Sequence, residues 1–181
     1  AEILDEITSK DFISSQVKYH LDRGLAAETL KLWGDAETHF NWILTRNPDN
    51  ASALYNLGNI RLSQENWIQA LELFNRASLS QSDFLLALSN KALTTYQLGK
   101  LDKAESELRA IIMKYPLFAD ARAALSALLW HKGSLGEAKS NWAAAVGLDN
   151  RYKQQEWLLG IRRWPPEPTK DLLAFLALEN L

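Results

Sequence analysis

Small and large apolar residues recur along the chain in a fixed order, with polar residues between them. A small residue occurs at four places, and a large apolar residue follows each of them four positions later. The small residues are Ala36, Ala70, Ala104 and Ala138, and the large residues that follow are Phe40, Phe74, Leu108 and Trp142. A third position comes three residues later, at Ile43, Ala77, Ile111 and Ala145. Because steps of four and three residues keep side chains on one helical stripe, the pattern predicts four helices with an apolar face.

Corresponding positions are always 34 residues apart, which divides most of the chain into four consecutive units. The units run over residues 17–50, 51–84, 85–118 and 119–152. A fixed period of this length is typical of stacked helix–turn–helix repeats. Position 8 of each unit is also small, at Gly24, Gly58, Ala92 and Ser126, which would let the two helices of a unit approach closely. We therefore expect eight array helices, with Gly99 and Gly133 in turns between partner helices.

Residues 1–16 precede the array and form an N-terminal capping or tether segment. Ile3, Leu4 and Ile7 fall on one helical face, and Phe12 and Ile13 continue the apolar content. This predicts a short helix that covers the first repeat. The alternative is a tether leading from a removed targeting sequence or membrane anchor.

Residues 153–181 follow the array and contain a run of prolines after Trp164. Residues 154–163 fit the first helix of an unfinished fifth repeat, and Pro165, Pro166 and Pro168 then stop it. Thr169 can cap a last, leucine-rich helix. We expect these residues to act as a C-terminal cap, since solenoids need caps on their exposed ends. Trp164 should be buried among side chains such as Leu158, Ile161, Leu172 and Leu176. The alternative is that the Trp-Pro-Pro segment is a docking motif.

Composition argues against several classes of function. The net charge of −2 draws the chain toward neither nucleic acid nor anionic lipid. No cysteine is present, and no apolar run reaches the ~18 residues that span a membrane. The three histidines lack metal-ligand spacing, and no phosphate-binding loop or nucleophile elbow occurs. The sequence therefore predicts no catalytic residue, no cofactor and no metal site.

The repeat pattern resembles the tetratricopeptide repeat (TPR) family. The best-matching unit begins at Ala51, continues through Leu54, Leu57 and Gly58, and has its second helix at residues 67–77. The resemblance covers roughly three quarters of the chain, residues 17–152. It implies an all-α, right-handed superhelical solenoid of four 34-residue helix–turn–helix repeats with helical end caps.

In this family the first helix of each unit lines a concave groove, mainly through its positions 2, 5, 9 and 12. The residues that the resemblance places in a partner-binding groove are Leu21, Leu25, Tyr55, Asn59, Leu62, Leu86, Ser89, Asn90, Leu93, Tyr96, Ala123, Ala127 and Trp130. The same positions include Lys18, Glu28, Ser52 and Asp120. Such a mixed lining suits an amphipathic helix or an extended segment with apolar anchors. We expect Tyr55, Tyr96 and Trp130 to be at least partly exposed there; packing between repeats or against the N-terminal segment would instead bury some of these positions.

One subtype of the family binds acidic C-termini of chaperones through a clamp of cations and asparagines. Asn59 and Asn90 match its asparagines, but Tyr55, Asp120 and Ala124 stand where its cations belong. Since a terminal carboxylate needs those cations, this ligand is not expected.

The resemblance implies a non-catalytic scaffold that binds another protein. The segment from Arg162 to Pro166, followed by a leucine-rich helix, is similar to the tails of TPR proteins of chloroplasts and cyanobacteria. That similarity implies a thylakoid-associated photosystem assembly factor. The alternatives are a bacterial periplasmic or cytosolic adaptor and a regulatory subunit of a soluble enzyme.

Overall fold

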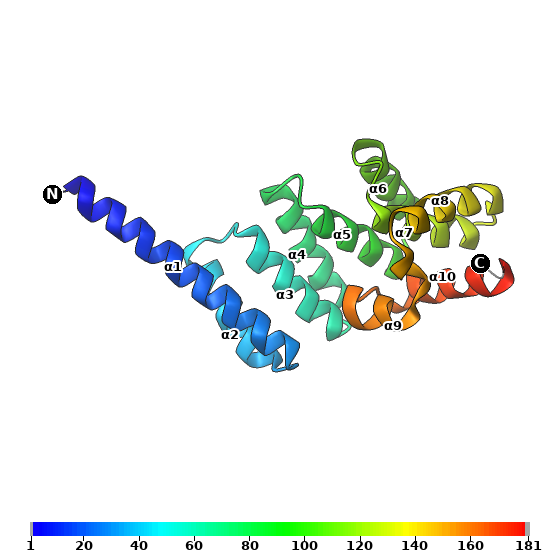
Figure 1. The fold of residues 1–181 in the computed structure, drawn as a ribbon. Helices are drawn as coiled ribbons and strands as arrows, with labels where there is room; N and C mark the ends of the chain where they lie inside the picture. Colours follow the sequence, from blue (N-terminus) through cyan, green and yellow to red (C-terminus); the bar gives the residue numbers. More distant parts are fainter. Residues whose placement is uncertain (1, 180–181) are drawn as a thin grey trace. The chain divides into compact units, whose positions relative to one another are not determined.

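The structure is a computed structural model that describes the backbone of residues 2–179 and the side chains of residues 10–178. The chain divides into two compact units, Ala1–Ser82 (unit 1) and Asp83–Leu181 (unit 2). Every regular element between residues 2 and 179 is helical (Figure 1).

Unit 1 consists of two antiparallel helix pairs joined by short turns. Its helices are α1 (Glu2–Thr29), α2 (Trp33–Arg46), α3 (Ala51–Ser63) and α4 (Trp67–Ser80). Helix α1 is continuous, so the chain has no break between the N-terminal segment and the first helix of the array. Phe12 and Ile13 are exposed, whereas Ile3, Leu4 and Ile7 lie outside the side chains that the structure describes.

Unit 2 contains two further pairs and a C-terminal segment. The pairs are α5 (Leu85–Gln97) with α6 (Leu101–Lys114) and α7 (Ala119–His131) with α8 (Leu135–Leu148). A 3₁₀ turn (Asn150–Lys153), α9 (Gln155–Trp157), a π-helical turn (Leu158–Arg162) and α10 (Pro166–Glu179) follow. We call residues 150–179 the tail.

Each helix pair turns through one residue with positive φ. Gly99 and Gly133 hold these places in unit 2, at φ 73° and 82°, as predicted from the sequence. In unit 1 the equivalent residues are Lys31 and Glu65, at φ 58° and 59°. All four positions are 34 residues apart, so the same left-handed turn recurs with either glycine or a long polar residue.

The predicted small residues do let partner helices meet closely. Gly24 faces the buried ring of Phe40, and Gly58 faces the buried ring of Phe74. A Cβ atom on Gly58 would lie 2.7 Å from Cε1 of Phe74, closer than van der Waals contact allows. Ala70, which is fully buried, provides the corresponding small surface on α4. The close approach therefore depends on having no side chain at position 8 opposite a phenylalanine.

Gly58→Ala is expected to lower the free energy of unfolding of unit 1 by about 1–3 kcal/mol, because the new methyl group overpacks the contact with Phe74. Gly34→Ala is the matched control, since a Cβ atom there meets nothing within 4 Å. The control should be neutral or stabilise the helix, by up to about 1 kcal/mol. Urea denaturation followed by circular dichroism measures both changes. Equal effects of the two substitutions would contradict the packing argument.

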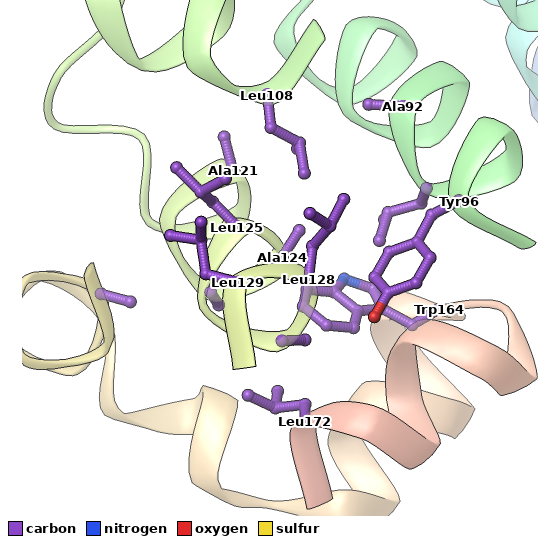
Figure 2. Packing of buried hydrophobic residues seen from close by; sticks show 14 of the residues in the cluster. Ala92, Tyr96, Leu108, Ala121, Ala124, Leu125, Leu128, Leu129, Trp164 and Leu172 are labelled. Carbon is purple, nitrogen blue, oxygen red and sulfur yellow. The ribbon is translucent and has the colours of Figure 1, made fainter. Parts of the chain in front are cut away.

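The core of unit 2 joins the two helix pairs to the tail (Figure 2). Leu93, Leu108 and Leu128 belong to the same buried cluster as Trp164 and Leu172. Helix α10 packs against both α7 and α5. The tail is therefore part of the core of unit 2.

The tail differs from the sequence prediction in two respects. Helix α10 begins at Pro166, so Thr169 is not its cap and instead donates a hydrogen bond to the carbonyl of Pro165 at 2.8 Å. Proline is favoured in a first helical turn because the N–H groups there have no intrahelical partner. Trp164 is buried as predicted, at 3% exposed, but Ile161 is 72% exposed and does not cover it.

Candidate functional site

The predicted groove positions of unit 1 lie on α1 and α3. Leu21, Tyr55 and Asn59 are half-buried, and Leu25 is 39% exposed. Leu62 is buried in a cluster with Ala70 and Phe74, so it supports the helix pair and does not line an open surface.

Tyr55 is held in place by the core beneath it. Its ring packs against the cluster of Leu62 and Phe74, with 5.8 Å between its centroid and that of Phe74. Leu21 packs in the same way against the cluster that contains Phe40. These side chains present one edge to the surface while the other edge is fixed, which is the arrangement of a preorganised apolar anchor.

In unit 2 most of the predicted groove positions are buried. Those that are buried are Ser89, Asn90, Leu93, Tyr96, Ala123 and Ala127. Trp130 is half-buried, and Leu86 is 39% exposed. Tyr96 is only 2% exposed, so the prediction that its ring is accessible is wrong. The reason is that the tail packs over this face of α5 and α7.

The centre of the covered groove is the carboxylate of Asp120, which is 1% exposed. Its Oδ1 accepts hydrogen bonds from the Tyr152 hydroxyl at 2.7 Å, from Nε of Arg162 at 2.8 Å and from Nε1 of Trp164 at 3.0 Å. Its Oδ2 accepts from the Ser89 hydroxyl and from Nη2 of Arg162. Both oxygens are thus fully used, by side chains from α5 and from the tail.

The guanidinium of Arg162 bridges the two helices of the groove. It donates to Asp120 on α7 through two nitrogens, and its Nη1 donates to Oδ1 of Asn90 on α5 at 2.8 Å. Burial acts to raise the pKa of Asp120, but the charge and hydrogen bonds of Arg162 outweigh it and hold that pKa below its ordinary value. Asp120 and Arg162 therefore form a buried, bidentate salt bridge in which both side chains are ionised.

A second buried carboxylate, that of Asp171, connects α10 to α5 and α7. Oδ2 of Asp171 accepts a hydrogen bond from the Tyr96 hydroxyl at 2.6 Å and lies 2.9 Å from Nδ1 of His131. Burial, together with the hydrogen bond to Asp171, raises the pKa of Tyr96. Tyr96 therefore stays protonated and remains a donor. The groove side chain that the sequence suggested as an anchor for a partner instead holds the chain's own helix.

The sequence pattern places Asp120 at a groove position, where the chaperone-binding subtype has a cation, but it indicates no partner for Asp120 or for Arg162. The available signal was charge complementarity: an acidic residue at a groove position of α7 and an arginine in an apolar tail. Because the two residues are 42 positions apart, no local sequence pattern predicts that they pair.

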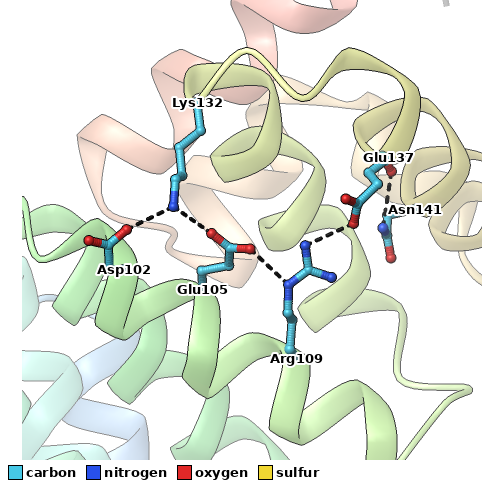
Figure 3. Close-up of polar contacts among 6 residues, drawn as sticks. All are labelled: Asp102, Glu105, Arg109, Lys132, Glu137 and Asn141. Atoms are coloured by element: carbon cyan, nitrogen blue, oxygen red, sulfur yellow. Dashed lines mark hydrogen bonds and ion pairs between the residues drawn. The ribbon is translucent and has the colours of Figure 1, made fainter.

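A network of charged side chains links α6 to α8 and to Lys132, the residue that follows α7. Lys132 pairs with Asp102 and Glu105, and Arg109 pairs with Glu105 and Glu137, each at 2.7–2.8 Å (Figure 3). These pairs are partly or largely exposed to solvent, where such interactions contribute little.

Nδ1 of His20 lies 2.9 Å from Nδ1 of His39, but no group of three or more potential ligands that could hold a metal ion occurs among the described residues. None of the helices described here is both long and apolar enough to cross a membrane.

Solved structures similar to this chain are repeat proteins of low sequence identity. MamA from Desulfovibrio magneticus RS-1 is 15% identical, with a TM-score of 0.65 over 91% of this chain and 96% of MamA. Pseudomonas aeruginosa PilF is 16% identical, with a TM-score of 0.69 over 92% of this chain and 77% of PilF. YrrB, described as a TPR protein with an unusual peptide-binding site, is 17% identical, with a TM-score of 0.62 over 89% of this chain and 85% of YrrB. At these identities the similarity concerns the fold alone.

Part of a larger enzyme has the same fold. The O-GlcNAc transferase of Thermobaculum terrenum is 20% identical, with a TM-score of 0.59, over 65% of this chain, but this chain spans only 22% of that enzyme. A comparison with curated protein sequences found no match.

The sequence model of the tetratricopeptide repeat matches residues 17–83 and 90–153, well over half of the chain. The two matched segments contain the recurring small and large apolar positions and the four left-handed turns described above. The chain therefore belongs to the tetratricopeptide repeat family.

Proposed function

We propose that this protein is a non-catalytic scaffold that binds a segment of a partner protein along α1 and α3 of unit 1. The observation that carries the proposal is the contrast between two sets of equivalent positions. Those of α5 and α7 are largely covered by the tail, whereas Leu21, Leu25, Tyr55 and Asn59 remain half-buried or exposed. Aromatic side chains such as that of Tyr55 are enriched among the few residues that supply most of the binding free energy in protein interfaces.

Two further observations support a protein ligand. The family to which the chain belongs consists mainly of protein-binding repeats, and YrrB, of the same fold, has a peptide-binding site. Leu25 provides an apolar contact, and Asn59 provides an amide on the neighbouring helix. An amphipathic helix, or an extended segment with apolar anchors, matches that combination.

The test is a binding measurement on single variants of the full chain. A photo-crosslinking residue at position 25 identifies the bound protein, and titration calorimetry with that purified protein then gives the affinity. Leu25→Ala and Tyr55→Ala are each expected to weaken binding by tenfold or more, since an anchor contributes roughly 2 kcal/mol. Leu79→Ala is the matched control, because Leu79 is 75% exposed on α4 and outside the predicted groove.

Circular dichroism checks that each variant keeps its helical content. Unchanged affinity of both groove variants, or equal losses in the control, would place the partner site elsewhere on the molecule.

A more specific proposal, a thylakoid-associated photosystem assembly factor, is supported by the tail sequence from Arg162 to Pro166. Within unit 2 these residues already serve packing, through Arg162 and Trp164. The gene sequence upstream of Ala1 tests the location directly, because it would contain a targeting or anchor segment. Capture of one soluble enzyme in place of a membrane complex would favour a regulatory subunit, and an export signal or none would favour a periplasmic or cytosolic adaptor.

A further inference from the structure

The groove of unit 2 contains a bound polypeptide segment, which is the chain's own tail. The contacts divide into a polar part, where Arg162 and Trp164 meet Asp120, and an apolar part, where Leu172 and Phe175 enter the core. In the tetratricopeptide repeat family, the corresponding positions line the concave groove. The tail therefore shows which side chains this groove accepts.

The polar part recognises its ligand by chemistry that few sequences satisfy. A buried carboxylate requires a cation with several donors, and the fork of a guanidinium meets both oxygens of Asp120 while also reaching Asn90. The indole N–H of Trp164, two residues later, donates to the same carboxylate. A lysine would lose the second contact, and a phenylalanine would lose the indole donor. The groove thus selects arginine followed two residues later by tryptophan.

The backbone of the tail contains unfavourable geometry next to these contacts. Arg163 has φ 58° and ψ 51°, a left-handed conformation that is unfavourable for a non-glycine residue. The preceding residues, Leu158–Arg162, form a π-helical turn, a rare conformation that occurs frequently at functional sites. Ile161 and Leu159 of this turn are exposed at 72% and 46%. A competing segment with glycine between the arginine and the tryptophan would adopt this left-handed conformation with less strain.

We propose that the groove between α5 and α7 is a second, closed binding site, selective for a partner-protein segment with arginine two residues before tryptophan. The chain's own tail occupies the site until such a segment displaces it. This site is additional to the surface of α1 and α3 and does not depend on it. The partner is a protein segment because the site recognises an arginine and a tryptophan at fixed spacing, followed by apolar anchors.

A competition experiment on the full chain tests the proposal. The probe is a fluorescent peptide with the sequence of residues 155–179, and the control peptide carries R162A and W164A. The wild-type chain should bind the probe weakly, because its own tail is present at high effective concentration. The chain with Arg162→Ala should bind the probe at least tenfold more tightly than wild type does, because its tail no longer satisfies Asp120. Neither chain should bind the control peptide.

A covalent crosslink between the tail and α5, which we call the lock, is the matched control for displacement of the tail. The backbone N–H of Glu167 donates to Oε1 of Gln97 at 2.8 Å, so cysteines at these two positions would lie close together. The chain has no native cysteine, so a short bismaleimide would join only this pair. Crosslinking in the Arg162→Ala background should abolish probe binding. Binding that survives the lock would show that the probe attaches outside the groove and would overturn the proposal.

The remaining outcomes also decide the question. If the Arg162→Ala chain is folded by circular dichroism but binds neither peptide, or binds both equally, the tail is a permanent cap and the proposal is wrong. If that variant does not fold, hydrogen exchange on the wild-type chain replaces it: excess probe, but not the control peptide, should accelerate exchange in α10, and equal rates would overturn the proposal. A concentration-dependent wild-type dimer that the lock abolishes would identify a second copy as the occupant, and would also overturn it.

Discussion

Replacing Asp120 with alanine should lower the free energy of unfolding of unit 2 by about 3–5 kcal/mol, because the substitution leaves the buried guanidinium of Arg162 without its counter-ion. The side chains of Ser89, Tyr152 and Trp164 lose an acceptor in the same step. Urea denaturation followed by circular dichroism measures the change. Hydrogen exchange should show the loss in α5 to α10, while α2 to α4 keep their protection, because repeat arrays are stabilised locally.

The matched control for this prediction is Asp102→Ala. Asp102 also pairs with a cation, Lys132, but its side chain is 96% exposed. Its removal should change stability by no more than about 0.5 kcal/mol. In the double variant Asp120→Ala, Arg162→Ala, the loss should be smaller than the sum of the two single losses, because each single variant already breaks the pair. A change below about 1 kcal/mol for Asp120→Ala would contradict a buried ion pair.

Trp164→Ala should be of similar severity, about 3–5 kcal/mol, the usual range for a buried aromatic side chain. Trp164 is 3% exposed within the cluster that includes Leu128, Leu158 and Leu172 (Figure 2). Its indole also donates to Asp120, so truncation removes a hydrogen bond as well as packing. Hydrogen exchange should show lost protection beyond about Ala119, with the earlier helices still protected.

Ile161→Ala is the matched control for Trp164→Ala, because Ile161 lies only three residues away but is 72% exposed. It should shift the urea midpoint very little. If Trp164→Ala keeps full protection and loses binding of a partner protein, Trp164 is a ligand and not a structural residue. In that case the Trp-Pro-Pro segment would be a docking motif.

Much of this architecture is predictable from the sequence because the constraints on it are local. The recurring small residue with a large apolar one four residues later specifies a helix and the face on which it packs, as Ala70 and Phe74 show. The turns at Gly99 and Gly133 follow from the conformational freedom of glycine. The same turn at Lys31 is not predictable in this way, because its left-handed conformation costs energy that the packing of both helices offsets.

The conformation of the tail is not predictable from local sequence patterns. An ideal helix of residues 154–163 would place Ile161 on the same side as Leu158, one turn apart, and so predicts that both cover Trp164. The π-helical turn from Leu158 to Arg162 changes the rotation per residue between these two side chains, and Leu158 is buried while Ile161 is exposed. Neither distortion has a sequence signal of its own, since both arise from fitting the tail against α5 and α7.

The sequence by itself determined the helices, their pairing and the faces that could form a groove, because periodicity and side-chain size act over a few residues. Only the tertiary structure decided that the tail covers those faces within unit 2. Tyr55 and Tyr96 occupy comparable groove positions, yet one is half-buried and the other is held by Asp171 beneath the tail. The difference depends on contacts between residues 42 to 75 positions apart. Burial of a charge such as Asp120 is favourable only when such a distant partner folds back onto it.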